Sequence, residues 1–391
     1  MKSNCTVVRL EDIATDLSDG LHKAPVFVKG GEYIFVNATN LESGHIVDKD
    51  QEKHTTYEEY LKYGIPLTER TILYSIDGTI GNIARYHGEK CVLGKGACYI
   101  TVKNDVDVDY VYYQLQSPHF RSYISSMATG STIRHISLKT MRNYCFPLPC
   151  FDTQKKISSI LKSIDDRIST NSQINDNLLQ QAQSIFSREF LSLYRIPDGW
   201  RESSLLGIAD YLNGLAMQKY RPSDDEQGLP VLKIKELRQG SCDSGSEMCS
   251  PSIKPEYIVH DGDVIFSWSG SLLVDFWCGG ICGLNQHLFK VTSSAYDKWF
   301  YYSWTGHHLQ RFVAIAADKA TTMGHIKREE LAKAEVLIPS QSDYERIGGL
   351  LAPIYDLVIA NRIENRKLAA LRDELLPQLM SGEIDVSEVS L

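Results

Sequence analysis

The sequence predicts an α+β fold in which two globular α/β domains are separated by a pair of long antiparallel coiled-coil helices, with an internal pseudo-two-fold repeat. Two observations predict it. The second half of the 391-residue chain repeats the first at a nearly constant offset, and each half ends in a long run with coiled-coil spacing. Because two copies are too few for a solenoid, we expect two similar but unequal faces within one polypeptide.

The repeat is clearest in the segments that close each half. His135 returns as His325, a shift of 325 − 135 = 190 residues. Earlier segments match with shifts between 189 and 196 (291 − 102 and 240 − 44), and residues 92–102 match 281–291 at a shift of 189. Drifting shifts indicate insertions and deletions in the loops between retained strands. This pattern is expected when the loops carry a recognition task that differs between the copies.

The composition limits the class of protein. Its 43% hydrophobic and 23% charged residues are ordinary for a globular protein of two or three domains. A net charge of −8 argues against a freestanding DNA-binding protein, because phosphate contacts require Lys and Arg. Any nucleic-acid role must therefore depend on local basic clusters or on basic partner subunits.

The cysteines indicate a reducing compartment. We expect no signal peptide and no membrane span, and none of the nine cysteines forms a C-x-x-C pair, so the expected location is cytoplasmic with reduced thiols. Cys278-x-x-x-Cys282 with nearby His287 has the wrong spacing for a zinc knuckle and occurs in only one copy. Buried free thiols are the better interpretation, and we predict no metal site.

The helical runs show the alternating 4-3 spacing of a coiled-coil seam. Each is expected to hold about 35 residues, or about 50 Å at 1.5 Å per residue. A lone helix with such a stripe must bury it, and the nearest matching stripe belongs to the other copy. The predicted seam and partner-contact residues are Ile157, Leu161, Ile164, Ile168, Asn171, Asn175 and Leu178 in the first helix, and Ile347, Leu351, Ile354, Val358, Asn361, Asn365 and Leu368 in the second, where Arg372 takes the next seam position.

Two adjacent seam positions in each copy are asparagines, Asn171 with Asn175 and Asn361 with Asn365. Apolar residues would pack better there, so stability is given up, and the usual gain is a register fixed by amide pairing. The alternative is that these side chains face solvent or a loop. Because the pair occurs in both copies, we favour a fixed register, and hence a spacer of defined length between two domains.

The remaining sequence divides into two globular segments rich in short β-type runs. We predict a first domain at 1–150, a helix at 151–192, a second domain at 193–338 with a linker at 193–199, and a second helix with a tail at 339–391. One short helix is expected to begin near Asp109 and its counterpart near Asp297. The predicted strands lie at 33–36, 71–74, 98–102, 231–234 and 263–266, separated by turns such as Asp77-Gly78 and Asp261-Gly262.

Two loops at matching places, 130–139 and 320–328, combine hydroxyl groups with basic side chains. Such donors suit phosphate and base-edge contacts, although a strand-to-helix connection with capping hydroxyls explains them as well. The run Lys233-x-Lys235 alternates as a strand would, which places both lysines on one sheet face, and a solvated face is the alternative. The predicted DNA-binding residues are Ser75, Thr79, Lys95, Thr132, Arg134, His135, Lys139, Lys233, Lys235, Ser267, Thr322, His325 and Lys327.

Motifs for catalysis are missing from the sequence. The nearest phosphate-loop match, from Gly88 to Gly96, has one residue too many between its glycines and lacks the Ser or Thr that binds Mg²⁺. There is no G-x-S-x-G, H-E-x-x-H or G-x-G-x-x-G motif, and no carboxylate pattern repeats beside the paired histidines. Because a pair of equal active sites would repeat its chemistry, we predict a non-catalytic binding subunit.

Several motifs resemble one known family. Pro147-Leu148-Pro149, followed by the segment 154–168, is similar to the central conserved region of type I restriction-modification specificity subunits. The segment 374–384 resembles that family's closing segment, and 73–81 looks like a strand-loop of its target-recognition domains. The resemblance covers almost the whole chain. It departs after Pro149, where the usual second proline and glutamate are missing, and the second copy has also lost the glutamine that corresponds to Gln154.

The resemblance implies two target-recognition domains, each reading one half of a bipartite, asymmetric DNA site in phage defence. The helices would set the spacer and bind two methyltransferase subunits, and endonuclease-translocase subunits would complete the complex. This chain would bind no cofactor, since S-adenosylmethionine would bind to the methyltransferase subunits, and ATP and Mg²⁺ to the endonuclease subunits. Half-sites about one DNA turn apart, roughly 34 Å, need two modules held at such a separation.

The same residues admit two other classes of protein. A non-catalytic coiled-coil scaffold that binds protein or glycan explains the acidity and the missing motifs, but not the basic, hydroxyl-rich loops in matching places. A self-contained nuclease or methylase is disfavoured because its motifs are missing. Genes for an adenine methylase and a helicase-like nuclease beside this one would favour the DNA-recognition subunit.

Overall fold

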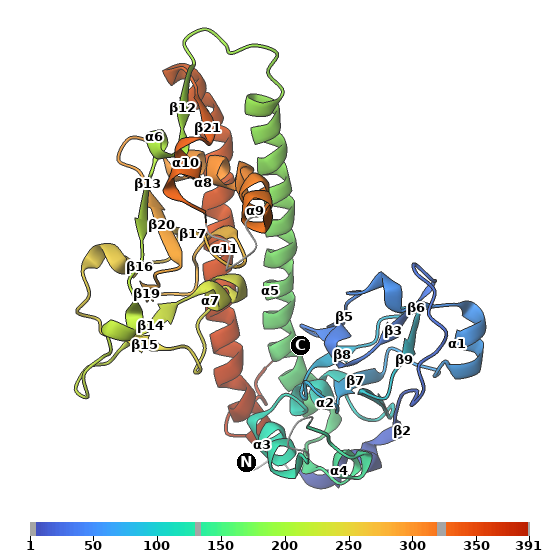
Figure 1. Cartoon of the computed structure of the whole chain (residues 1–391). Coiled ribbons are helices and arrows are strands. Elements are labelled where there is room, and N and C mark those ends of the chain that lie inside the picture. Colours follow the sequence, from blue (N-terminus) through green and yellow to red (C-terminus); the bar gives the residue numbers. More distant parts are fainter. Residues whose placement is uncertain (1–4, 130–133, 319–325, 390–391) are drawn as a thin grey trace. The chain divides into compact units, whose positions relative to one another are not determined.

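The structure is a computed structural model that describes residues 5–129, 134–318 and 326–389. The chain forms two compact units, Met1–Asp166 with Ala370–Leu391, and Arg167–Ala369. Two long helices, α5 (Phe151–Phe186) and α11 (Gln341–Ser381), each contribute to both units (Figure 1). Every other strand and helix belongs to a single unit within the described ranges.

The first unit is built around an antiparallel four-stranded sheet in the order β2-β10-β7-β8. Its middle strand β7, with the sequence TILYS, is buried throughout, as expected for an apolar and β-branched run. The strands are β1 (Thr6–Arg9), β2 (Ala14–Asp19), β3 (Tyr33–Val36), β4 (Leu41–Glu42), β5 (His45–Ile46), β6 (His54–Thr55), β7 (Thr71–Ser75), β8 (Ile83–Arg85), β9 (Cys91–Leu93), β10 (Ala97–Val102) and β11 (Cys145–Leu148). The short helices are α1 (Tyr57–Tyr63), α2 (Val108–Gln114), α3 (Pro118–Met127) and α4 (Leu138–Arg142).

The second unit repeats this plan with the sheet order β13-β20-β17-β18. Its strands are β12 (Arg201–Ser204), β13 (Asp210–Asn213), β14 (Leu229–Leu232), β15 (Met248–Cys249), β16 (Ile258–Val259), β17 (Val264–Ser267), β18 (Leu273–Phe276), β19 (Cys282–Leu284), β20 (Leu288–Thr292) and β21 (Glu335–Ile338). Its short helices are α6 (Leu205–Ile208), α7 (Ile234–Gln239), α8 (Lys298–His307), α9 (Leu309–Asp318) and α10 (Arg328–Ala332).

Strand pairing confirms the internal repeat. The pairs β1-β11 and β12-β21 correspond, as do the parallel pairs β3-β9 and β14-β19. Ile72 faces Ile100 in one sheet and Val264 faces Val291 in the other, so β10 and β20 differ by 291 − 100 = 191 residues. The predicted shift of 189 is wrong by two. A slip of two residues keeps every side chain on its own sheet face, so the apolar pattern alone does not detect it.

Each unit has its own apolar core, and the long helices complete both cores. Ile157 and Leu161 of α5 join the first core together with Leu379 and Met380 from the end of α11. The second core is closed by the other ends of these helices, including Phe186, Ile347 and Leu351. The C-terminal residues are therefore part of the first unit, packed with strands and helices from the opposite end of the sequence.

Most predicted elements are present, and one is wrong. Strand β3 has the predicted bounds, and α8 begins directly after Asp297. The run 231–234 is not one strand, because β14 ends at Leu232 and helix α7 begins at Ile234. The Lys233 N–H donates to the Glu236 carboxylate at 3.3 Å, which caps the new helix. Lys233 and Lys235 therefore do not alternate along a strand.

The long helices contain 36 and 41 residues. Helix α11 continues through Pro353 and Pro377, each of which removes one backbone donor without ending the helix. In the described part of the chain, no helix has the length and apolarity needed to cross a bilayer. The predicted domain bounds at 150, 192 and 338 stay a prediction.

Candidate DNA interface and helical pair

The first candidate loop is fastened at its base to the loop that follows β7. The Gly78 N–H donates to the Arg134 carbonyl at 3.0 Å, and the Ile136 N–H donates to the Ile76 carbonyl at 2.9 Å. The His135 ring contacts the Asp77 carboxylate through Nδ1. The second unit keeps one of these bonds, since the Ile326 N–H donates to the Trp268 carbonyl at 3.1 Å. Both units thus hold the same two loop bases together.

The two predicted serines lie at the ends of buried strands. The Ser75 hydroxyl donates to the Thr79 carbonyl at 2.6 Å and accepts from the Asn82 N–H at 2.8 Å. The Ser267 hydroxyl lies 2.9 Å from the Ser271 carbonyl oxygen, to which it donates. Both serines are fully buried, so in this structure their hydroxyl groups close their own loops. Thr79 is exposed in the loop that follows β7.

Four of the predicted cations are exposed and carry no ion pair to any described residue. Lys95 lies in the turn between β9 and β10, Arg134 precedes His135, Lys139 lies on α4, and Lys327 directly precedes α10. Since no described carboxylate pairs with them, these side chains are open to contact with a ligand. Their role in DNA binding stays a prediction.

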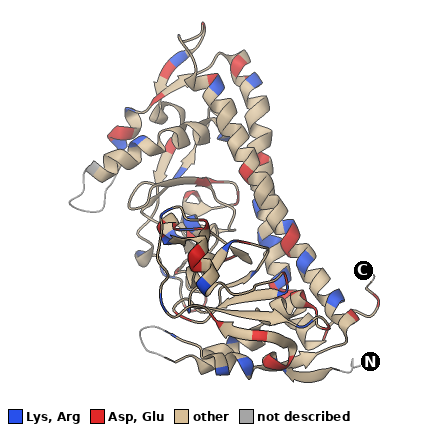
Figure 2. Cartoon of the chain, turned by 90° about the vertical axis from the view of Figure 1, so that its right-hand side faces the viewer, with Lys and Arg blue, Asp and Glu red and all other residues tan. Residues whose placement is uncertain are grey.

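Two other predicted cations are already paired within the second unit. The Lys233 ammonium lies 2.8 Å from Glu247, and the Lys235 ammonium lies 3.1 Å from Asp243. A phosphate would have to compete with these carboxylates. Basic and acidic residues are interspersed throughout the cartoon in Figure 2. Three predicted residues, Thr132, Thr322 and His325, lie outside the described residues.

The seam asparagines pair with one another across the two long helices. The Asn361 amide donates to the Asn175 side-chain oxygen at 2.9 Å, and the Asn171 amide donates to the Asn365 oxygen at 2.9 Å. The two pairs have the same residue sum, 171 + 365 = 175 + 361 = 536, which requires antiparallel helices. The predicted amide pairing is present, and its hydrogen bonds form in this antiparallel register of α5 and α11.

The apolar seam residues bury the facing sides of the helices. In the first unit Ile157, Leu161 and Ile164 are buried, and the Arg372 guanidinium lies 2.9 Å from Asp165. Among the predicted seam residues of the second unit, Ile347, Leu351 and Val358 are fully buried, while Ile168, Leu178, Ile354 and Leu368 are partly buried. One predicted seam position thus holds an ion pair in place of an apolar contact.

A chain of polar contacts fixes α2 to the long helices in the first unit. The Tyr113 hydroxyl donates to Asp165 at 2.7 Å, and Arg372 pairs with the other oxygen of that carboxylate. Burial, and then the nearby Asp165, raise the pKa of Tyr113, so the hydroxyl keeps its proton and acts as the donor. Because both long helices contribute, this contact holds the recognition fold, α5 and α11 together.

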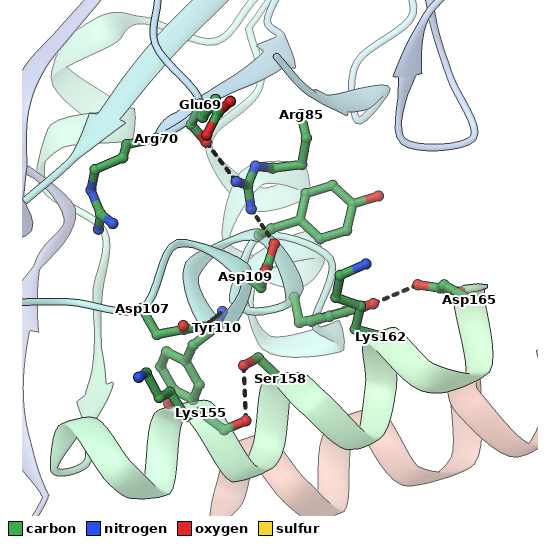
Figure 3. A network of polar contacts seen from close by, with 12 residues as sticks. Glu69, Arg70, Arg85, Asp107, Asp109, Tyr110, Lys155, Ser158, Lys162 and Asp165 are labelled. Carbon is green, nitrogen blue, oxygen red and sulfur yellow. Dashed lines mark hydrogen bonds and ion pairs between the residues drawn. The ribbon is translucent and has the colours of Figure 1, made fainter. Parts of the chain in front are cut away.

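A second network lies beside it on β8 and α2. The Arg85 guanidinium pairs with Asp109 and donates to the Glu69 carbonyl at 2.6 Å (Figure 3). Arg85 Nε is buried and has no partner within the described residues. The network ties the edge strand of the sheet to the helix that contacts α5.

In the second unit α11 supplies the corresponding attachment through two arginines. The Arg366 guanidinium binds Asp261 through both nitrogens, at 2.7 and 2.8 Å, and also donates to the Cys278 carbonyl at 2.7 Å. Arg362 pairs with Asp275 at 2.7 Å. Burial opposes ionisation of Asp261, but the Arg366 guanidinium holds the pKa of that carboxyl below its usual value.

These attachments and one cavity were missed by the sequence analysis. The attachment residues are not repeated: at the repeat shift of 190 residues, the position that corresponds to Arg366 is Asp176. The cavity brings Arg134, which was predicted, together with Tyr74 and Arg121, which were not. A signal existed in the differences between the copies, because Tyr74 corresponds to Phe266 within otherwise matching strands (266 − 74 = 192).

The fold and these sites define a protein with two related recognition domains attached to one antiparallel helical pair. A family model for the type I restriction modification DNA specificity domain matches residues 2–180. The type I restriction enzyme MjaIX specificity subunit of Methanocaldococcus jannaschii is 24% identical over 344 residues, covering 82% of this chain and 78% of its own length. The MjaVIII specificity subunit of the same organism is 22% identical, covering 88% and 89%.

A solved structure has the same fold. The S subunit of a type I restriction-modification system from M. genitalium matches with a TM-score of 0.58 at 15% identity, covering 97% of this chain and 96% of the other. The predicted fold class is confirmed. Residues 2–180 match the specificity-domain model, and most of the chain is similar to type I restriction-modification specificity subunits.

Proposed function

We propose that this chain is the DNA-recognition subunit of a type I restriction-modification complex. Each recognition domain reads one half of a bipartite, asymmetric DNA site, and the helical pair sets the spacer between the halves. The chain performs no catalysis itself. In this proposal it works in the cytoplasm, where it directs the chemistry of its partners to one DNA sequence.

One observation carries the proposal. The same strand order occurs twice, while the loops and attachments differ between the copies. A scaffold alone has no need for two versions of one recognition fold with different basic and hydroxyl-bearing loops. A reader of two unlike half-sites needs both the shared framework and the difference.

The partners follow from the same proposal. Two methyltransferase subunits bind the helical pair and carry S-adenosylmethionine, and endonuclease-translocase subunits carry ATP and Mg²⁺. The methyltransferase subunits extrude the target adenine from the duplex and supply much of the contact to phosphate. This division of work accounts for a DNA-binding subunit with a net charge of −8.

Deletion of the gene is expected to remove adenine methylation from one split DNA motif and from no other. Genome-wide methylation mapping of the intact and deleted strains checks this, with the gene restored on a plasmid as the control. The restored strain should regain the same motif. A deletion strain that keeps every split motif methylated would exclude the proposed role.

Exchange of residues 200–338 for the matching segment of another family member is expected to change one half of the motif only. The exchanged segment runs from the start of β12, at Arg201, to the end of β21, at Ile338, so the ends of the exchange fall at strand termini. The other half-site and the spacer should stay as they were, because the first unit and both helices are untouched. Methylation mapping reads all three features at once, and a change in both halves contradicts independent recognition.

A further inference from the structure

A cavity of about 400 Å³ opens in the first unit beside the loop that follows β7. Helix α3 contributes Arg121 and Ser125, the chain before the loop base contributes Arg134, and β7 contributes Tyr74. The ring of Tyr74 belongs to the apolar core of this unit, whereas Arg121, Ser125 and Arg134 do not. The cavity lies next to Gly78 and Arg134, whose backbone bond fastens the candidate loop.

The charge of the cavity is positive. Among the described residues that line it, Arg121 and Arg134 are the only charged ones. Neither guanidinium has an ion pair or a side-chain hydrogen bond with any residue that the structure describes, whereas Arg9 and Arg366, for example, are paired with carboxylates. Two uncompensated cations at one concave site in a chain of net charge −8 attract an anion.

A hydroxyl group on the cavity wall points to the same kind of ligand. Tyr74 is only 2% exposed, and within the described ranges its hydroxyl has no hydrogen-bond partner. A Cβ built on Gly81, another lining residue, would lie 3.6 Å from this oxygen, and the φ of +104° at Gly81 keeps that position free of a side chain. Burial raises the pKa of Tyr74, so the hydroxyl keeps its proton and can donate a hydrogen bond to a ligand in the cavity.

The second copy has lost all three groups. Tyr74 stacks edge-on against Phe120 with ring centres 5.3 Å apart, and Phe266 contacts Phe312 at 5.9 Å, so both residues shift by 192. Phe266 thus replaces Tyr74, and at the same shift Val313 replaces Arg121. At the shift of the neighbouring histidines, 190, Gly324 replaces Arg134. The fold does not need these groups, so they serve a task of the first copy alone.

We propose that this cavity binds one backbone phosphate of the DNA half-site read by the first recognition domain. Arg121 and Arg134 pair with the phosphate oxygens and the Tyr74 hydroxyl donates a third bond. All three groups donate hydrogen bonds and two of them are cations, which suits the acceptor oxygens of an anionic phosphate. The inference rests on the proposed function and deepens it: this contact places the DNA on the first domain but reads no base.

The test measures DNA affinity over a salt series for the full chain assembled with its methyltransferase subunits, on a duplex that carries the mapped motif. Arg121→Gln combined with Arg134→Gln should weaken binding about tenfold and lower the slope of log K against log salt by about 0.9, the value for one phosphate. Tyr74→Phe should weaken binding about threefold and leave the slope unchanged, because no charge is removed. Arg9→Gln is the matched control, since it removes an exposed arginine already paired with Glu11 and Asp12, and it should keep wild-type binding.

A second arm identifies the source of the phosphate. Duplexes in which one phosphate at a time is a neutral methylphosphonate should show one position in the first half-site where wild type loses affinity and the double variant loses no more. If inorganic phosphate raises the melting temperature of wild type but not of Arg121→Gln, and no such position exists, the cavity binds a free anion and the proposal is overturned.

The two proposals fail differently. A wild-type complex that does not prefer the mapped motif contradicts the proposed function. A wild-type complex that binds the motif, with a double variant of unchanged slope and wild-type melting temperature, contradicts the phosphate site alone. The Tyr74→Phe variant tests the site without disturbing the fold, because the second copy has phenylalanine, Phe266, at the corresponding position.

Discussion

Lengthening both long helices by one heptad is expected to move methylation to a site with the same two half-sites and a longer spacer. The insertions would follow Asp166 in α5 and Ala369 in α11, with leucine at both seam positions. They fall between the contact of Asp165 with Arg372 and that of Asn171 with Asn365, so both contacts survive. Seven residues add about 10 Å of helix, or at most about three base pairs at 3.4 Å each. Methylation at the original spacing should disappear, and methylation mapping measures the change directly.

The control is the same insertion in α5 alone. Extra residues in one helix prevent the amide pairs and the contact of Asp165 with Arg372 from keeping their registers together, because the two helices then differ in length between these contacts. That variant should methylate neither the old site nor a longer one. Retained methylation at the original spacing in the double insertion would mean that the helices do not measure the spacer.

The parts of the fold that could be predicted from the sequence are those encoded twice. The seam spacing indicated the helical pair, and the amide pairing of Asn175 with Asn361 follows from a polar residue placed where an apolar one packs better. Strand β3 was predicted because its run of apolar and aromatic residues is bounded by turn residues. Each of these signals is local along the chain, and the seam signal appears in both copies.

The contacts that could not be predicted join residues far apart in only one copy. The charge of Arg372 interrupts an apolar seam, and nothing near it in the sequence indicates Asp165 as its partner. The alternation of Lys233 and Lys235 predicts a strand, but Glu236 accepts from the Lys233 N–H and caps a helix there instead. The cavity could not be predicted for a related reason. Its cations come from α3 and from the residue before His135, and only the folded chain brings these two segments together.

The attachment of the second recognition domain should depend on Arg366. Arg366→Ala is expected to lower the free energy of unfolding of the second unit by about 2 to 3 kcal/mol, because it leaves the partly buried Asp261 without its partner. Arg167→Ala is the matched control on the same helical pair. It breaks an exposed pair with Glu364, where the loss should stay below about 1 kcal/mol. Hydrogen exchange of residues 258–283 localises the effect to the strands and loops that Arg366 holds.

The pH dependence separates lost charge pairing from lost packing. The folded state holds the pKa of Asp261 below its ordinary value of 3.8, so its ionised form stabilises the fold above that value. This stability is lost as the pH falls through the lower, folded-state pKa. In Arg366→Ala the carboxyl no longer has this support, so the deficit relative to wild type should be constant from about pH 7 to 5 and should shrink below about pH 4. A deficit that is the same at pH 3.5 and pH 7 would assign the role of Arg366 to its aliphatic stem packed against the loop, and the ion pair would then not be what attaches the domain to α11.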